Sequence, residues 1–282
     1  MSKRYLFSLM AVLAATFIFV SACVKSGPTD PVTADSTATA TCVLTATITA
    51  TISATSTAQG TSTVTPTVTP TAQTVTALFR NDSLPAGYDG GKDTFIDDIN
   101  VTLINGACAW TAMSGGISYG IARTLMYFDL SSIPSTAVIT YVGLSIYLYS
   151  DTAGGGIKIH PVTTPWSEGS ACNNSGATGG ATWNEAVKGT SSWATAGGDY
   201  NSLIEAGAVS FGAITAGNYF SFTSFTNSNL ADMVQGWVSV PANNHGMLIK
   251  AIDETVDQAA VFCSGNHTTE TLRPLLQVQY IQ

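Results

Sequence analysis

Residues 138–150 read VITYVGLSIYLYS, and apolar side chains alternate along this run with tyrosine, serine and other residues. Successive side chains of a β-strand point to opposite faces, so the two-residue period predicts a strand with one buried face. The predicted buried face is aliphatic: Val142, Leu144, Ile146 and Leu148. The other face turns outward or towards a second layer, and it carries Tyr141, Ser145, Tyr147 and Tyr149.

Similar short runs recur from residue 77 to the end, separated by clusters of Gly, Asn, Asp, Ser and Pro. In GNYFSFTSF (217–225), Phe220 and Phe222 share one face and Tyr219 takes the other. The segment 229–238 differs, because Leu230, Met233, Val234 and Trp237 recur at helical spacing behind two capping residues, Ser228 and Asn229. These patterns predict an all-β fold, an antiparallel β-sandwich plugged by one short helix.

The N-terminal segment has the three parts of an export signal. Lys3 and Arg4 precede an apolar stretch from Tyr5 to Val20, and small residues follow it. About sixteen helical residues rise roughly 24 Å, less than the roughly 30 Å of a bilayer core, which disfavours the alternative of a membrane span. Residues 1–22 are therefore predicted to be a signal peptide.

The quartet Val20-Ser21-Ala22-Cys23 resembles the lipobox of bacterial lipoproteins, in which the cysteine receives a diacylglyceryl group and becomes the first mature residue. An ordinary cleavage site beside a cysteine is the alternative. Buried acyl methylenes contribute about 0.8 kcal/mol each, so lipidated Cys23 would anchor the protein to a membrane. Val24 follows instead of Asp, which by resemblance to the Gram-negative sorting rule favours the outer membrane if the organism is Gram-negative. We expect a lipid-anchored protein at the cell surface.

Residues 23–76 form a low-complexity tract. From Thr29 to Thr76 there are 19 threonines, no aromatic residue, no Lys or Arg, and only Asp30 and Asp35 as acids. Such a stretch buries too little apolar surface to offset chain entropy. The tract is predicted to be a disordered, extended or O-glycosylated spacer in front of a folded domain at 77–282.

The predicted domain is acidic, with 7 Lys and Arg against 16 Asp and Glu. Nucleic acid is excluded as a partner, because binding phosphates requires a basic face. Export permits disulfides among four cysteines, for which three pairings are open: Cys42, Cys108, Cys172 and Cys263. None of them lies in a CxxC pair or beside a suitable His, which disfavours zinc.

Aromatic side chains are the candidates for a sugar site, because the apolar face of a pyranose stacks on a ring while neighbouring polar groups bond its hydroxyls. Trp166 and Trp237 are expected in the core, after a strand and on the helix stripe respectively. Trp183 and Trp193 flank a loop rich in Gly, Ser and Asn. The predicted carbohydrate-binding residues are Trp183, Trp193, Tyr147 and Tyr149. Packing against a partner sheet is the alternative for the tyrosines.

The segment YDGGKDTFIDD (88–98) offers carboxylates of the kind that calcium prefers: Asp89, Asp93, Asp97 and Asp98. Their spacing does not match a helix-loop-helix calcium site, and solvated loop acids are the alternative. Asp89 and Asp93 are the predicted metal ligands, with structural calcium as the one cofactor considered.

No catalytic residue is predicted. Glu168 and Glu185 are the most tempting carboxylate pair, but neither lies in a recognisable motif, and GxSxG, HExxH and phosphate-loop motifs are absent. His160, His245 and His267 are widely separated along the chain. A glycosidase or lyase would need groups that converge only in three dimensions.

Seven segments resemble, in order, the DNRLRE domain, also described as carbohydrate-binding module family 96. They are RTLMYFDLSSIP, ITYVGLSIYLY, HPVTTPWSEG, ATWNEA, NLADMVQGWV, NNHGMLIKA and RPLLQVQYI, within about 92–281. The resemblance implies a jelly-roll-like β-sandwich on secreted proteins, with polysaccharide binding, including of alginate, attributed to some members. The chain departs from the family at Phe262-Cys263-Ser264-Gly265, where an acid often follows the serine.

The predicted function is therefore polysaccharide binding or adhesion by a lipoprotein, without bond cleavage. An anionic glycan such as alginate would meet a domain of like charge, so the ligand is expected to be neutral or bridged by calcium. A structural envelope module without a sugar site is the main alternative, and a polysaccharide-degrading enzyme is the third.

Overall fold

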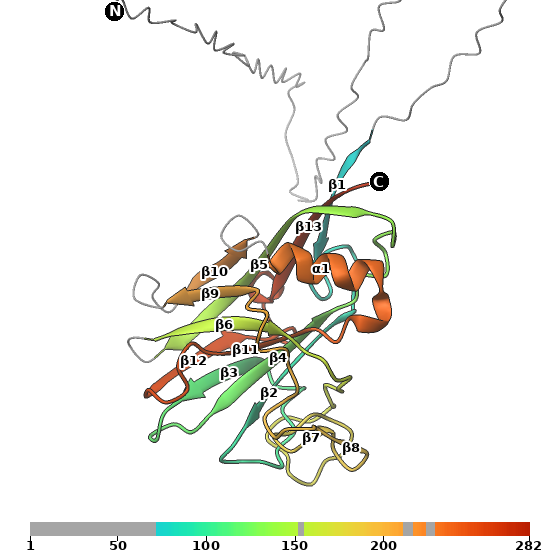
Figure 1. The fold of residues 1–282 in the computed structure, drawn as a ribbon. Helices are drawn as coiled ribbons and strands as arrows, with labels where there is room; N and C mark the ends of the chain where they lie inside the picture. The colour runs from blue at the N-terminus through green and yellow to red at the C-terminus, as the bar shows by residue number, and fades with distance from the viewer. Residues whose placement is uncertain (1–71, 152–154, 211–216, 224–228) are drawn as a thin grey trace, which may run out of the picture. The chain divides into compact units, whose positions relative to one another are not determined.

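The computed structural model describes residues 72–151, 155–210, 217–223 and 229–282 (Figure 1). The strands are β1 (Thr74–Phe79), β2 (Gly91–Asp97), β3 (Trp110–Gly115), β4 (Ala122–Phe128), β5 (Val138–Asp151), β6 (Gly156–Pro161), β7 (Glu185–Val187), β8 (Ser191–Ser192), β9 (Gly207–Ser210), β10 (Asn218–Thr223), β11 (Met247–Ala251), β12 (Gln258–Cys263) and β13 (Leu275–Ile281). Helix α1 spans Asn229–Ser239, and short 3-10 turns span Pro241–Asn243 and Glu270–Leu272. The predicted signal peptide, the lipidation site at Cys23 and nearly all of the predicted spacer lie outside the described residues.

Eleven strands form one antiparallel sheet in the order β1-β13-β5-β12-β3-β4-β11-β6-β9, with β10 paired to β5 and β2 paired to β4. The sheet curls so that β9 comes to lie beside β10, as Figure 1 shows. Strands β7 and β8 form a separate small hairpin. The predicted all-β antiparallel sandwich with one short helix is confirmed.

Strand β5 has the predicted alternation. Its four aliphatic residues from Val142 to Leu148 are fully buried and belong to the main hydrophobic core. Strand β10 pairs along β5, with Asn218 opposite Leu148 and Thr223 opposite Gly143. Tyr219 is exposed, as its face of β10 predicts, whereas the side chains of Phe220 and Phe222 lie outside what the structure describes.

Helix α1 confirms the predicted helical period. Its buried residues are Leu230, Met233, Val234, Trp237 and Val238. They join the same core as the aliphatic face of β5, so the helix fills the space inside the curled sheet. Gln235 fixes the helix to the start of β5, because its amide accepts a bond from the Ile139 N–H (2.8 Å) and donates one to the Ala137 carbonyl (3.1 Å).

A second hydrophobic core covers the outer face of the sheet at β4 and β11. Leu125 and Leu248 belong to this core, whereas their neighbours Met126 and Met247 belong to the main one. The long connection between β6 and β9 supplies the cover, with Trp193 buried in it and Trp166 and Trp183 packed against it as partly buried side chains. Strands buried on both faces read as nearly continuous apolar runs, which explains TLMYF and GMLI.

The disulfide joins Cys108 to Cys172. Backbone bonds reinforce the link, since the Ala107 N–H donates to the Ala171 carbonyl at 2.9 Å. Cys263 is a buried free thiol, and burial raises its pKa to about 11. Cys42 lies outside the described residues.

The folded part begins slightly earlier than the predicted boundary at residue 77. Strand β1 starts at Thr74 and pairs with β13, with Thr74 opposite Ile281 and Phe79 opposite Leu276. The last threonines of the tract thus belong to the sheet. In the part of the chain that the structure describes, no helix combines the length and apolar character needed to cross a membrane.

Candidate functional site

Tyrosine side chains line the outer face of strands β5 and β10, and this surface is here called the tyrosine face. Tyr147 and Tyr149 project from β5, and the register of the two strands places Tyr219 directly opposite Tyr147. Tyr149 is 63% exposed and Tyr219 is 42% exposed. The rings of Tyr147 and Tyr219 meet edge to face, with centroids 5.1 Å apart. The face therefore presents several accessible ring surfaces in a ridged arrangement.

Tyr141 extends the tyrosine face along the same strand, about 20 Å from Tyr147 at roughly 3.3 Å per residue. The Tyr141 side chain lies over Gly143, since a Cβ atom added there would lie 2.8 Å from the Tyr141 hydroxyl oxygen. Glycine at this position thus makes room for the ring to lie along the sheet.

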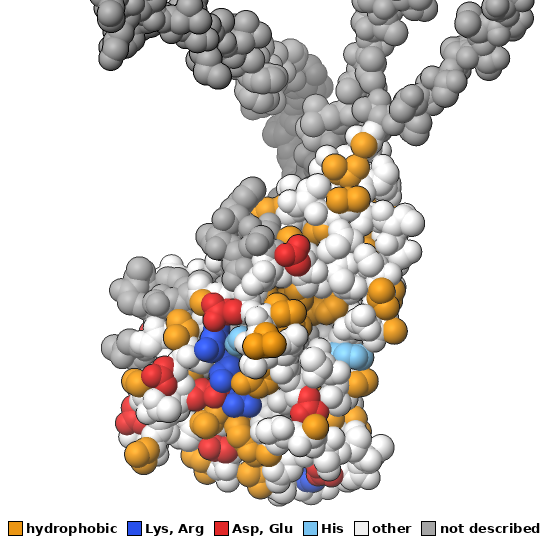
Figure 2. All heavy atoms as spheres, viewed as in Figure 1, with side chains coloured by type: hydrophobic (Ala, Val, Ile, Leu, Met, Phe, Trp, Pro, Cys, Tyr) orange, Lys and Arg blue, Asp and Glu red, His pale blue; other side chains and the backbone are white. Residues whose placement is uncertain are grey.

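The polar groups of the tyrosine face are hydroxyls and amides. Ser145 and Ser221 share a hydrogen bond of 3.0 Å between their hydroxyls, and the register of β13 places Gln277 opposite Gly143. Strands β1, β5, β10 and β13 contain a single charged side chain, Asp151. On the face of the molecule that Figure 2 shows, the Lys and Arg side chains gather over the lower half of the view. A surface of this composition bonds hydroxyl groups without favouring either sign of charge.

The two predicted loop tryptophans lie in the second core instead of on the tyrosine face. Trp193 is 5% exposed, and its indole N–H donates to the Thr182 carbonyl at 2.8 Å. Trp183 is half-buried under the Arg123 guanidinium, whose carbon lies 5.1 Å from the ring centroid. Arg123 is itself held by both oxygens of Glu254, at 2.7 and 2.9 Å. These contacts stabilise the long connection and leave Trp193 no ring face for a sugar.

The two predicted calcium ligands lie in different surroundings. Asp89 is exposed in the turn before β2, whereas Asp93 in β2 is 4% exposed. Among the described residues, no group of three or more His, Cys, Asp or Glu side chains could hold a metal ion. Asp93 interacts with another carboxyl group, that of Glu168, which accepts a hydrogen bond from the Asp93 backbone N–H at 3.0 Å.

Burial raises the pKa of Asp93 to about 7, even though the Gly265 N–H donates to its carboxylate at 2.5 Å. The charge of Glu168 acts in the same direction. Gly265 closes over this carboxyl group, and a Cβ there would lie 3.1 Å from an Asp93 oxygen. A side chain at position 265 would therefore crowd this carboxyl group.

Asp93 and Glu168 form a carboxylate pair that the sequence did not reveal. Burial raises the pKa of Glu168 as it does that of Asp93. The hollow beside Asp93 holds only about 10 Å³, enough for one water molecule and too small for a sugar ring. Glu185 has a separate environment, where its carboxylate accepts a bond from the Gly189 N–H at 2.9 Å.

The three histidines have different contacts in the fold. His160 is buried and its Nδ1 lies 2.7 Å from the Ile204 carbonyl, while burial lowers its pKa. His267 Nδ1 accepts a bond from the Thr269 N–H at 3.1 Å. His245 lines a groove beside helix α1.

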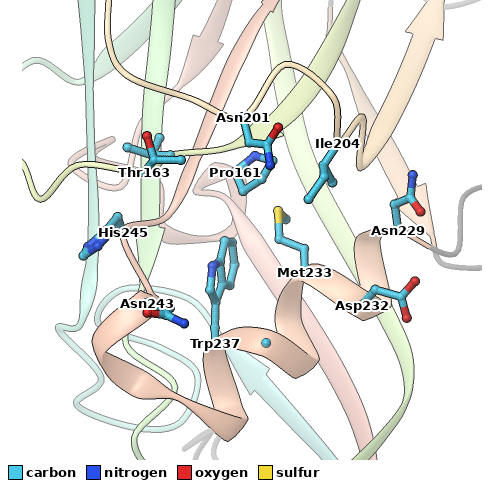
Figure 3. A pocket seen from close by; sticks show the side chains of 12 residues that line it. Pro161, Thr163, Asn201, Ile204, Asn229, Asp232, Met233, Trp237, Asn243 and His245 are labelled. Atoms are coloured by element: carbon cyan, nitrogen blue, oxygen red, sulfur yellow. The ribbon is translucent and has the colours of Figure 1, made fainter. Parts of the chain in front are cut away.

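This groove, of about 540 Å³, runs between α1 and the segments that follow β6 and precede β11. Figure 3 shows Trp237 and Met233 rising from the helix towards Pro161, Asn201 and Ile204 on the opposite wall. His245 and Asn243 lie at one end, and Asp232 lies at the other. The groove is here called the helix groove, and its volume is that of a small-ligand site.

In the part of the chain that the structure describes, the sheet order and helix α1 define an all-β sandwich module. Residues 107–278 match the family described as Disaggregatase related repeat domain, and since this is more than half of the chain, the chain belongs to that family. No curated protein matches the chain. The tyrosines of β5 and β10 and the whole helix groove fall within the matched residues.

The predicted membership of the DNRLRE domain, or carbohydrate-binding module family 96, was wrong, because the matching family is a different one. The segments that suggested it are strands, turns and one amphipathic helix that serve the sandwich core. Antiparallel sandwiches of similar element order share such patterns, so their succession does not identify a family.

Proposed function

We propose that this chain is a lipid-anchored surface protein whose sandwich binds a polysaccharide without cleaving it. The observation that carries the proposal is the tyrosine face, where Tyr149 is 63% exposed among hydroxyl and amide groups. Rings with accessible faces and nearby hydroxyls provide the stacking and hydrogen bonding that sugar recognition needs. The family description names no ligand, so the ligand class is inferred from this surface.

The ligand we propose is a neutral polysaccharide. The domain is acidic overall, while the strands that carry the tyrosine face hold one charged residue, Asp151. An anionic chain would be repelled by the domain and would find no cation on this face. Binding of an anionic glycan through calcium is the outcome that would revise the ligand class.

Replacing Tyr147 or Tyr149 by Ala is expected to weaken binding about tenfold each, because a stacked aromatic pair contributes about 0.5–1.5 kcal/mol beyond its buried area. Binding is measured for the full chain on an array of neutral and anionic glycans, with and without calcium. Tyr149→Phe should retain most of the affinity, since it keeps the ring.

Tyr119→Ala is the matched control, because Tyr119 is also an exposed tyrosine, at 44%, but lies in the loop between β3 and β4. Equal losses for Tyr119→Ala and Tyr149→Ala would contradict a role for the tyrosine face. Absence of binding to every glycan in both conditions would overturn the proposed function.

The anchor is tested separately by fatty-acid labelling of expressing cells. Wild-type protein should take up the label and sediment with membranes, and Cys23→Ser should do neither. Labelling of the Cys23→Ser variant would refute the lipid anchor and leave the sugar-binding proposal untouched.

A second candidate function is protein assembly at the surface. Ile117 is fully exposed at the tip of the β3–β4 connection, and Val256 is 51% exposed in the loop before β12. The two loops are joined, because the Gly116 N–H donates to the Glu254 carbonyl at 2.9 Å. Neighbouring aliphatic tips of this kind favour a protein partner, and an array without glycan signal would make assembly the leading function.

A further inference from the structure

We propose that the helix groove is a second binding site, distinct from the tyrosine face, which takes one or two rings of an uncharged sugar. The first observation concerns Trp237, which is 5% exposed and lines the groove. Within the described residues its indole N–H has no protein acceptor and faces the groove, where water or a ligand can accept its hydrogen bond.

Two further tryptophans, the buried Trp193 and the partly buried Trp166, show the contrast. Trp193 donates to the Thr182 carbonyl at 2.8 Å, and Trp166 donates to the His245 carbonyl at the same distance. Backbone carbonyl oxygens thus accept the hydrogen bonds of these two indole N–H groups, while the N–H of Trp237 opens into the groove. A hydrogen-bond acceptor on a ligand, such as a sugar hydroxyl, would accept a bond from this N–H.

The second observation concerns Gly236, which lines the groove from the middle of α1. Glycine is among the poorest residues for a helix interior. Packing does not require it here, because a Cβ atom at Gly236 would meet nothing within 4 Å. A residue that weakens the helix without a packing reason is expected at a functional site.

The lining defines the ligand class. Pro161, Ile204 and Met233 supply an apolar wall, on which the C–H face of a sugar ring can lie. Asn201, Asn243 and Thr163 supply amides and a hydroxyl.

The charges of the groove lining restrict the class of ligand further. Asp232 is the only acid of the lining, Lys and Arg are absent from it, and burial lowers the pKa of His245, which therefore stays neutral at pH 7. A carboxylated sugar would find no cation in the groove. The volume of about 540 Å³ limits occupancy to a chain end or a short oligosaccharide.

The test is a titration of the full chain followed by the tryptophan indole N–H signals in two-dimensional NMR. The probes are cellobiose, maltose, lactose and diacetylchitobiose, with digalacturonate as the anionic arm. The Trp237 signal, assigned from a Trp237→Phe spectrum, should move with at least one neutral disaccharide and not with digalacturonate. The Trp193 signal should stay in place, because its N–H is bonded to Thr182. A Trp237 signal that ignores every neutral probe would overturn the proposal.

Matched variants separate binding from folding. Gly236→Leu fills the groove with a good helix former and should weaken binding at least tenfold without lowering the unfolding midpoint. Gly236→Ala should raise the midpoint and weaken binding less. Tyr149→Ala should leave the titration unchanged, which separates this site from the tyrosine face. Undiminished binding by Gly236→Leu would show that the sugar binds elsewhere.

Discussion

The Asp93→Asn variant is expected to gain about 4 kcal/mol of stability relative to the wild-type protein when the pH is raised from 4 to 8. Burial raises the pKa of Asp93 from 3.8 to about 7, so the folded protein holds a proton in this interval that the unfolded chain releases. Stability from that proton is fully present below about pH 4 and is lost as the pH rises to about 7. The two pKa values of Asp93 differ by about three units between the unfolded and folded states, which corresponds to about 4 kcal/mol of unfolding free energy.

Comparison of the two proteins isolates this effect from other titrating groups. Glu168 also has a raised pKa and acts in the same direction, while the lowered pKa values of His160 and His245 favour stability at higher pH. The two histidine contributions are common to both proteins and cancel in the difference, whereas Glu168 is coupled to Asp93 and its contribution belongs to the measured effect. An amide at position 93 can still accept the bond from the Gly265 N–H.

Urea unfolding followed by tryptophan fluorescence at pH 4, 6 and 8 measures the difference. Asp89→Asn is the matched control, because it removes an exposed carboxyl group in the turn before the same strand. Its stability should follow that of the wild-type protein at every pH. Parallel curves for wild type and Asp93→Asn would show that the Asp93 carboxyl group is not held in its neutral form.

Removal of the disulfide is the second large effect that we expect. Cys108 and Cys172 are separated by 64 positions, and closing a loop of that length restricts the unfolded chain by about 4 kcal/mol in the chain-entropy model. The double variant Cys108→Ala/Cys172→Ala should lose about that much stability. Reduction of the wild-type protein with dithiothreitol should have a similar effect.

The reductant provides its own control. It should not change the stability of the double variant, since Cys263 is a buried thiol whose pKa of about 11 keeps it protonated. Urea unfolding with and without dithiothreitol measures both proteins. A wild-type protein whose stability survives complete reduction would contradict the assigned contribution of this link.

The sequence predicted those elements in which one face meets water. In β5 the alternation of aliphatic and tyrosine residues follows directly from burial of one face. In the same way, the apolar stripe of α1 identifies the face of the helix that is buried. A two-residue or helical period carries this information because the other face is free to be polar.

The sequence could not predict which residues the second core buries. In β2, residues Asp93, Thr94, Phe95 and Ile96 are all buried, so the strand has no period from which the position of Asp93 could be inferred. Trp193 became inaccessible for the same reason, since the long connection folds back over β4 and β11.

The groove and the carboxylate pair were hidden by topology. Glu168 lies 75 positions from Asp93, and the walls of the helix groove come from segments between residues 161 and 245. One local signal was present in the sequence, because Gly236 interrupts an otherwise favourable helical pattern.

The pairing of β1 with β13 places Thr74 opposite Ile281, so the chain enters and leaves the sandwich at one corner. Copies of such a unit could be strung in tandem with short connectors. The same adjacency makes the fold a candidate for circular permutation, in which a brief linker joins the two strands and new ends open in a surface loop. Rearranged in this way, the molecule would keep every sheet contact while presenting its tyrosines and its groove at a chosen distance from whatever holds it.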